Sequence, residues 1–253
     1  MLIKFSHPSE SHEHSLLTLE LLNQFDNFMR SVNRVADLGC GSGLDSVWWA
    51  TRRDPAPPHV PRNYEVYPID CDFKNLDKTV RLHKNIHATL CDYNNLTFED
   101  KYFDVLWAHN SLQYSVNPLQ TLIEWHRVLD TDGMIYLSVP YNVNRQYNKF
   151  SGKTETGQLY HFMPSNIIYL LALAGFDTSD ARYCKLTGDS HFQIVAYKDG
   201  KGTLDISSSW YDIADTGRLD KSAEKFVHAK GYLDDYFLVG EWFTGSRYTF
   251  DKQ

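Results

Sequence analysis

Val35-Ala-Asp-Leu-Gly-Cys-Gly-Ser-Gly-Leu-Asp45 is the stretch that decides the fold, because here a short apolar run breaks directly into alternating glycines. The apolar part predicts a short buried strand. Gly39, Gly41 and Gly43 then remove every second side chain from the turn, so that backbone can approach a ligand closely. Residues 44–50 suit a buried helix, so the turn ends at a helix N-terminus, which favours an anionic or carboxylate-bearing ligand.

The spacing of the glycines narrows the choice of ligand. The dinucleotide pattern G-x-G-x-x-G fails because Leu44 and Ser46 hold the places of the third glycine, and the Gly-Lys-Ser/Thr of a P-loop is absent. What remains, Asp-x-Gly-x-Gly-x-Gly, resembles motif I of class I S-adenosylmethionine-dependent methyltransferases. The alternative is a glycine-rich turn of another Rossmann-like protein. The resemblance implies that the amino-acid end of S-adenosylmethionine is held by Asp37, Gly39, Cys40, Gly41 and Gly43.

Acidic residues follow the next two predicted strands. Residues 65–69 read as a strand that ends at Asp70, where a doubly wound fold meets the ribose hydroxyls of a nucleoside. Asp70 holds the family position with Cys71 beside it, and Asp72 is the alternative. Pro68 inside this strand predicts an edge strand or a bulge.

The third predicted strand, residues 86–91, stops at Asp92 and Tyr93. The resemblance assigns Asp92 to the adenine amino group and Tyr93 to the neighbourhood of the ring. A carboxylate can accept a hydrogen bond from such an amine. The competing interpretation of Asp92 is an aspartate that only closes a turn.

Residues 103–109 form the fourth predicted strand, and the resemblance directs its carboxyl end toward the methyl group and gives His109 a place in the cofactor site. The Asn/Asp-Pro-Pro-Tyr/Phe and Pro-Cys signatures of nucleic-acid base methylation are absent. His109 and His161 are the candidate general bases, since histidine titrates near neutral pH; the alternative is that each only hydrogen-bonds in or near the core. The long polar segment 140–163 predicts substrate recognition. The candidate substrate residues are Tyr114, Tyr141, Arg145, Tyr160 and His161.

The fold class implied by the resemblance is α/β: a Rossmann-like, doubly wound, mostly parallel seven-stranded sheet with an antiparallel terminal strand and helices on both faces. We expect three segments: an N-terminal helical cap (1–32) with an amphipathic helix over about 13–30, a methyltransferase domain (33–198), and an aromatic-rich C-terminal extension (199–253). The aromatic extension predicts a partial lid or a contact between subunits, and therefore a possible homodimer.

Composition restricts the partners. The net charge of −7 and the absence of a Lys/Arg run disfavour nucleic acid. No run of eighteen apolar residues occurs and the first residues are polar, which predicts a cytoplasmic protein with no membrane partner. The four cysteines form no C-x-x-C pair, so neither a metal site nor a disulfide framework is expected.

The sequence therefore predicts an S-adenosylmethionine-dependent methyltransferase. The methyl group moves by in-line displacement to an oxygen or nitrogen of a small-molecule acceptor and leaves S-adenosylhomocysteine. The alternatives are a non-catalytic cofactor-binding or scaffold protein of the same fold, and a methyltransferase acting on protein or nucleic acid. A nicotinamide oxidoreductase is weakened by the missing glycine.

Overall fold

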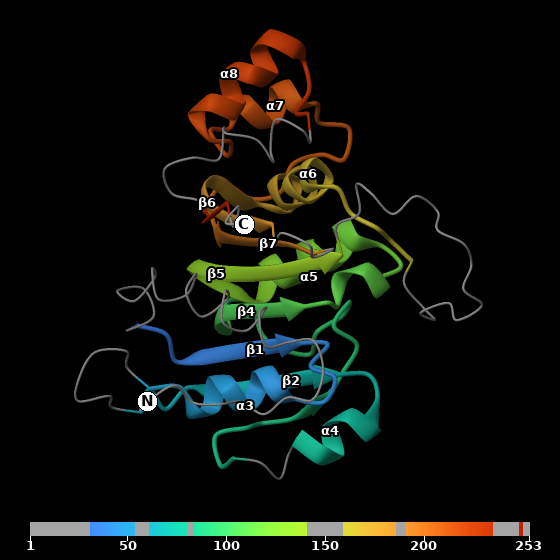
Figure 1. Ribbon diagram of the computed structural model, residues 1–253, viewed down its shortest axis with the longest axis vertical. Coiled ribbons are helices and arrows are strands. Elements are labelled where there is room, and N and C mark those ends of the chain that lie inside the picture. Colours follow the sequence, from blue (N-terminus) through green and yellow to red (C-terminus); the bar gives the residue numbers. More distant parts are fainter. Residues whose placement is uncertain are drawn as a thin grey trace.

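The computed structural model describes residues 31–53, 61–79, 83–140, 159–185, 191–234 and 248–249. A single sheet runs through them, with helices on both of its faces (Figure 1). The strands are β1 (Arg34–Leu38), β2 (Glu65–Asp70), β3 (Thr89–Leu90), β4 (Phe103–His109), β5 (Leu129–Pro140), β6 (Phe176–Lys185), β7 (His191–Lys198) and β8 (Tyr248–Thr249).

The strand order is β3-β2-β1-β4-β5-β7-β6-β8, and β7 is antiparallel to both of its neighbours while the other pairs are parallel. This confirms the predicted fold class, and the two-residue β8 extends the described sheet beyond the seven predicted strands. The order reverses at β1, which lies between β2 and β4. The carboxyl ends of these parallel strands share one edge, where open α/β sheets bind ligands.

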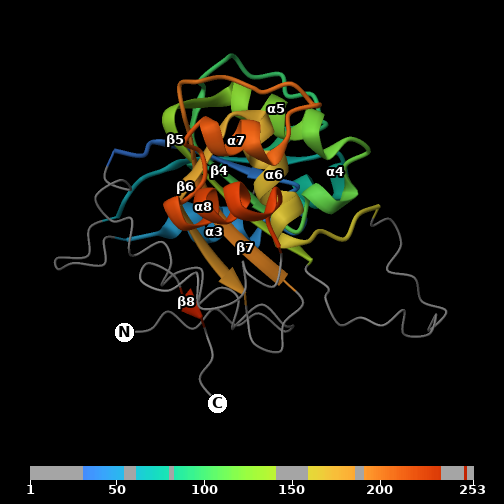
Figure 2. The same ribbon diagram turned by 90° about the horizontal axis from the view of Figure 1, so that it is seen from above.

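Two hydrophobic layers cover the sheet. The helices are α3 (Leu44–Thr51), α4 (Phe73–Thr79), α5 (Pro118–Val128), α6 (Pro164–Ala174), α7 (Trp210–Asp215) and α8 (Lys221–Lys230), with a 3-10 turn η1 (Leu112–Tyr114). Figure 2 shows α3 and α5 on opposite sides of the strands. Trp49 and Trp107 pack in the layer on the α3 side, and Leu106 and Trp125 pack in the larger layer on the α5 side. Side chains of β4 alternate between the two layers, as the period of a strand requires.

Local sequence signals set the ends of the helices around the sheet. The Asn117 side chain accepts a hydrogen bond from Gln120 N, and Pro118 occupies the first turn of α5, where its missing N–H is not needed. Helix α6 ends at Gly175, whose φ of 102° lies in the left-handed region. A Cβ at Gly175 would lie 2.7 Å from His126 Nε2, so close packing also requires this glycine.

The third strand is much shorter than residues 86–91, and Pro68 supplies a reason. Val66 N donates to Asn85 O and Cys91 N donates to Asp70 O, so the even-numbered residues of β2 face the third strand. Pro68 lies midway on that side and has no N–H to donate. The ladder is accordingly reduced to an isolated Val66–Ile86 bridge and the two residues of β3. Strand β2 is an interior strand, so of the two expectations for Pro68 the edge strand is wrong.

The proposed terminal segments are only partly visible. Residues 1–30, which include the predicted helix over 13–30, lie outside the described residues, as do 235–247. Residues 199–234 include α7 and α8, which lie beyond α6 at one end of the molecule (Figure 1). The division at residues 32 and 198 stays a prediction. In the described part of the chain, no helix has the length and apolar character needed to cross a membrane.

Candidate active site

The glycine turn after β1 is fixed by backbone conformation and close packing. Gly39 and Gly41 have φ values of 72° and 51°, in the left-handed region that favours glycine. Gly39 N donates to Ile69 O at 2.8 Å, and a Cβ at Gly39 would lie 2.7 Å from Ser111 Cβ. A Cβ at Gly41 would meet no described atom within 4 Å. Gly39 therefore permits the contact between two loops, whereas Gly41 faces open space.

The end of the turn leads directly into α3. Gly43, with φ 73°, is the N-cap of this helix, and its N–H donates to Cys40 O at 2.9 Å. The N-terminal N–H groups of α3 therefore begin at the glycine turn, where they favour a carboxylate. Cys40 is buried, and burial raises the pKa of its thiol well above the usual range. A thiol in this state is a packing group rather than a nucleophile.

Asp70 connects the end of β2 to the glycine turn. Its carboxylate accepts hydrogen bonds from Gly41 N at 3.0 Å, Asp72 N at 2.8 Å and Asn75 Nδ2 at 3.2 Å. A carboxylate has about four lone-pair positions, so these donors leave capacity for a ligand hydroxyl. Asp72 is exposed and its carboxylate receives Lys74 N in its own turn, while Cys71 between the two is exposed. Asp70, not Asp72, is thus the acid in contact with the glycine turn.

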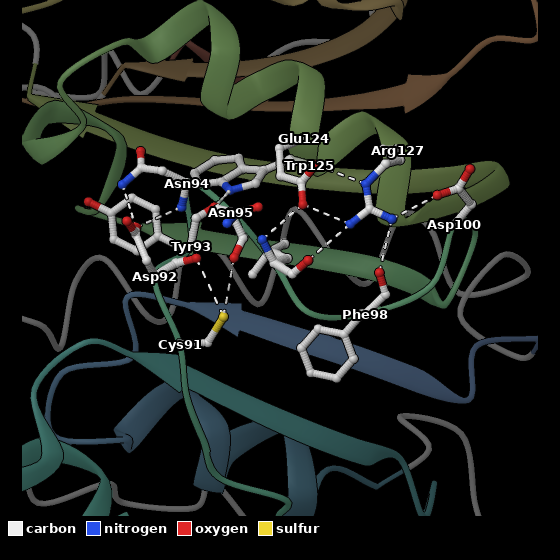
Figure 3. A network of polar contacts seen from close by, with 11 residues as sticks. Cys91, Asp92, Tyr93, Asn94, Asn95, Phe98, Asp100, Glu124, Trp125 and Arg127 are labelled. Atoms are coloured by element: carbon white, nitrogen blue, oxygen red, sulfur yellow. Dashed lines mark hydrogen bonds and ion pairs between the residues drawn. The ribbon is translucent and has the colours of Figure 1, made fainter.

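Asp92 and Tyr93 follow β3 and belong to a polar network shown in Figure 3. Asp92 Oδ1 accepts from Asn94 N at 2.9 Å and from Asn94 Nδ2 at 2.6 Å, so the turn that competed with the adenine role is present. Tyr93 OH donates to Ser111 O at 3.0 Å, and Trp125 Nε1 donates to Tyr93 O at 2.8 Å. Burial raises the pKa of Tyr93 to about 12, which keeps its hydroxyl a donor.

Asp37 is a buried carboxyl directly before the glycines. Ser46 Oγ donates to its Oδ2 at 2.5 Å. Burial, followed by the negative charge of Asp45, raises the pKa of Asp37 to about 7, against the lowering effects of the Ser46 hydrogen bond and of His109. A cationic ligand group beside Asp37 would favour its charged form.

His109 ends β4 and pairs with a residue that the sequence analysis missed. His109 Nδ1 lies 2.9 Å from Asp45 Oδ2, and Trp107 Nε1 donates to the same oxygen at 2.9 Å. Asp45 comes from the first turn of α3. Two signals point to it: Asp45 lies two residues after the last glycine of the turn, and Trp107 and His109 alternate onto one face of a strand. With the proton on Nδ1, toward Asp45, the basic lone pair of the imidazole lies on Nε2.

The candidate substrate residues are only partly brought together. Gln113 O accepts from Leu159 N at 2.9 Å and Tyr160 N at 3.2 Å, which places the segment that carries Tyr160 and His161 beside η1. Tyr160 OH donates to Val116 O at 3.1 Å. Tyr114, Tyr160 and His161 are exposed at this place, as are the apolar side chains of Val116 and Leu159. Tyr141 and Arg145 lie outside the described residues.

The predicted cofactor residues therefore gather along one edge of the sheet. Asp92, Asp70, Asp37 and His109 stand at or just after the carboxyl ends of β3, β2, β1 and β4, which are consecutive in the sheet. This arrangement is that of a Rossmann-like α/β protein with its candidate site where the strand order reverses.

Comparison with known proteins finds a matching family model for part of the chain. Residues 36–137 match the family model described as a methyltransferase domain. This segment is therefore similar to a methyltransferase domain, and solved S-adenosylmethionine-dependent methyltransferases share the fold of the chain.

Solved structures share this fold at low sequence identity. An S-adenosylmethionine-dependent methyltransferase from Methanosarcina mazei is 20% identical, with TM-score 0.54, over 72% of this chain and 98% of that one. A 1,6-didemethyltoxoflavin-N1-methyltransferase from Burkholderia thailandensis, solved with that compound and S-adenosylhomocysteine, is 16% identical, with TM-score 0.51, over 77% and 92%. The [4+2]-cyclase SpnF is 14% identical, with TM-score 0.51, over 71% and 82%.

Proposed function

We propose that this protein is an S-adenosylmethionine-dependent methyltransferase and that it transfers the methyl group to an oxygen or nitrogen atom of a small-molecule acceptor. The observation that carries the proposal is the placement of Asp37, Asp70, Asp92 and His109 along four consecutive strand ends beside the open space at Gly41. An acceptor on nucleic acid is disfavoured by the net charge of −7 and by the missing base-methylation signatures. The toxoflavin-precursor methyltransferase is a protein of the same fold named for a small-molecule acceptor.

The chain's own residues fit the cofactor along its length. The N-terminus of α3 and the glycine turn suit the carboxylate of the amino-acid end, and Asp37 suits its ammonium group. Asp70 retains acceptor capacity for the ribose hydroxyls. The remaining assignment, Asp92 and Tyr93 at the adenine, rests on the resemblance, and Asp92 Oδ2 is the carboxylate oxygen that would accept from the amine.

Positioning supplies most of the catalysis in this proposal. The cofactor supplies an electrophilic methyl group on a sulfonium, and the acceptor forms its new bond to carbon as the carbon–sulfur bond breaks. Holding the reacting atoms in line can contribute on the order of 7–11 kcal/mol. His109, oriented by Asp45 through the 2.9 Å contact, takes the acceptor proton on Nε2. His161 is the second candidate base, on the segment beside η1.

The [4+2]-cyclase with this fold favours a second candidate, a protein that keeps the site without transferring a methyl group. Turnover separates the two candidates. Methyl transfer from labelled S-adenosylmethionine to an acceptor supports the first, whereas cofactor binding without transfer to any acceptor of a broad panel supports the second. A homodimer formed through residues 199–253 stays a prediction. The mass of the protein in solution, measured by sedimentation, tests it.

Calorimetry tests the site with S-adenosylmethionine, S-adenosylhomocysteine and NAD as ligands. We expect micromolar binding of the first two and no binding of NAD. Gly41→Arg fills the open space and abolishes binding, and Asp70→Asn weakens binding about tenfold through lost charge–hydroxyl hydrogen bonds. Asp72→Asn is the matched control and leaves the affinity unchanged. Full affinity in both Gly41→Arg and Asp70→Asn, with the fold intact, would contradict the assignment.

A further inference from the structure

Two neighbouring strands carry buried polar side chains without a hydrogen-bond partner among the described residues. Ser138 lies in β5 and Gln193 in β7, and both side chains are fully closed to solvent, with 0% exposure. The atoms concerned are Ser138 Oγ and both Gln193 Oε1 and Nε2. A buried polar group that gives up water without gaining a partner destabilises the fold. Three such atoms on two residues that are partners in the sheet register call for an explanation.

These side chains continue a polar row that begins at His109. In the sheet register His109 pairs with Ser138, and Ser138 pairs with Gln193. Register partners point to the same face of a sheet, and adjacent strands lie about 4.8 Å apart. That face is the α3 face, because His109 contacts Asp45 of α3. The next row toward the sheet interior is apolar or aromatic and consists of Trp107, Tyr136 and Val195.

Other buried hydroxyls in the described chain show that the fold can satisfy such groups. Ser46 Oγ donates to Asp37, Ser115 Oγ bonds Thr121 Oγ1 at 2.6 Å, and Thr178 Oγ1 donates to Arg218 O at 2.7 Å. If positions 138 and 193 only filled space, apolar residues such as alanine, valine or methionine would stabilise the fold more than serine and glutamine do. We therefore expect the unpartnered atoms of Ser138 and Gln193 to form hydrogen bonds with a ligand.

The polar side chains of His109, Ser138 and Gln193 favour a neutral ligand that has a hydrogen-bond donor next to an acceptor. Gln193 offers one acceptor oxygen beside one donor nitrogen, which matches an edge with a donor next to an acceptor, and Ser138 adds a hydroxyl that can serve in either role. On the α3 side, Asp45 contacts His109 in this row and lies near Asp37, and these acidic groups disfavour an anionic ligand.

We propose that Ser138 and Gln193 bind the methyl acceptor, and that this acceptor is a neutral nitrogen heterocycle or cyclic amide that presents adjacent donor and acceptor groups. The inference rests on the proposed function and names the acceptor class of that site. His109, at the cofactor end of the row, faces the atom that receives the methyl group. Because the row is closed to solvent, this face must open locally for the acceptor to enter. When the face closes again over the acceptor, water is excluded from the reaction.

The test uses the full chain saturated with S-adenosylhomocysteine and four fragment probes read by saturation-transfer NMR. The probes are 2-pyridone, 2-aminopyridine, phenol and benzoate. We expect 2-pyridone or 2-aminopyridine to bind more tightly than phenol, and benzoate not to bind. Gln193→Met, which keeps the length of the side chain, weakens the best fragment at least tenfold, and Ser138→Ala weakens it about threefold. Both variants bind S-adenosylhomocysteine within twofold of the unsubstituted protein.

Thermal unfolding without ligand provides an independent readout. Gln193→Met and Ser138→Ala are expected to unfold at the same or a higher temperature, because they remove polar atoms that lack partners. Thr178→Val, the matched control, removes a bonded hydroxyl and unfolds at a lower temperature. Unchanged fragment affinity in Gln193→Met, or phenol binding as tightly as both 2-pyridone and 2-aminopyridine, overturns the acceptor proposal, while S-adenosylhomocysteine binding leaves the proposed function standing. Loss of S-adenosylhomocysteine binding by the unsubstituted protein overturns both.

Discussion

At the scale of single residues, two buried carboxyls near the glycine turn have contrasting surroundings. Asp70 receives hydrogen bonds from three donors, two of them backbone N–H groups. Asp37 receives one hydroxyl and lies near the negative charge of Asp45, so burial and this charge raise its pKa to about 7. The charged form of Asp37 therefore destabilises the folded protein, and the same charge would attract a cationic ligand.

Replacing Asp37 should change stability and binding in opposite directions. The folded protein holds the Asp37 proton up to a pH of about 7, whereas the unfolded chain loses it near the ordinary value of 3.8. The folded state thus binds more protons between these values, and stability falls as the pH rises through this window. Asp37→Asn removes that loss, so at pH 8 it should be more stable by on the order of 1–4 kcal/mol.

Denaturant unfolding at pH 4 and pH 8 measures the effect of Asp37→Asn, and calorimetry measures its binding of S-adenosylhomocysteine. We expect the two proteins to have similar stability at pH 4 and to differ at pH 8, with weaker binding by the variant. Ser46→Ala, which leaves the carboxyl but removes its donor, should instead be less stable at pH 8. The quantity to compare is the stability of Asp37→Asn minus that of the unsubstituted protein at each pH. An equal difference at pH 4 and pH 8 would contradict the charge argument.

At the scale of elements, α5 holds the segment between β3 and β4 that carries Asp92 and Tyr93. Arg127 of α5 binds both oxygens of Glu124, at 2.8 and 2.7 Å, and reaches Asp100 at 2.7 Å (Figure 3). Its guanidinium also donates to the backbone oxygens of Leu96 and Phe98, at 3.1 and 2.9 Å. The hydrogen bond from Arg127 holds the pKa of Glu124 below its usual range. One side chain thereby fixes a connection without regular structure.

Arg127→Met should loosen this connection. It leaves the carbonyl groups of Leu96 and Phe98 without this donor and Glu124 with only the backbone N–H of Leu96, so we expect a loss of about 2–4 kcal/mol of stability. Binding of S-adenosylhomocysteine should weaken severalfold because Asp92 and Tyr93 lose their support. Arg127→Lys keeps the charge but not the fork of donors and should fall between the two proteins. Equal unfolding midpoints for Arg127→Met and the unsubstituted protein in urea would show that the network carries no stability.

At the scale of the whole molecule, a buried ion pair attaches α7 and α8 to the body. Arg218, with 0% exposure, donates to both oxygens of Asp199 at 2.8 and 3.0 Å, to Ala172 O at 2.7 Å and to Gly202 O. Thr178 of β6 in turn donates to Arg218 O through both its N–H and its hydroxyl. The contacts join the segment before α8 to α6 and the sheet.

Arg218→Met should cost about 3–5 kcal/mol, since it leaves Asp199 charged and buried without its partner. The exposed pair of Lys221 and Glu224, at 2.9 Å, provides the control, and Lys221→Ala should change stability by no more than about 0.5 kcal/mol. Urea unfolding measures both variants, and limited proteolysis of Arg218→Met should cut first in residues 199–234. A similar, small loss in both variants would mean that the buried pair does not anchor the helices.

Features that depend on short stretches of sequence could be predicted from the sequence alone. The resemblance carried by the glycine spacing implied the fold class, and the residues that end the predicted strands located Asp37, Asp70 and His109 at one edge. Contacts across long stretches of chain were not predictable from local pattern. Asp45 meets His109 across 64 residues, and Arg218 meets Ala172 across 46. The polar row at Ser138 and Gln193 depends on strand register, which no single segment encodes.

The proline in β2 has a consequence for how the protein behaves among other copies of itself. By interrupting the ladder it leaves β3, the outer strand on that side of the described sheet, only two residues long. A long outer strand exposes a row of unpaired backbone groups that can recruit strands from other molecules, and very short outer strands are one way in which natural proteins avoid such aggregation. Pro68 thus protects this edge of the described sheet against growth by strand addition.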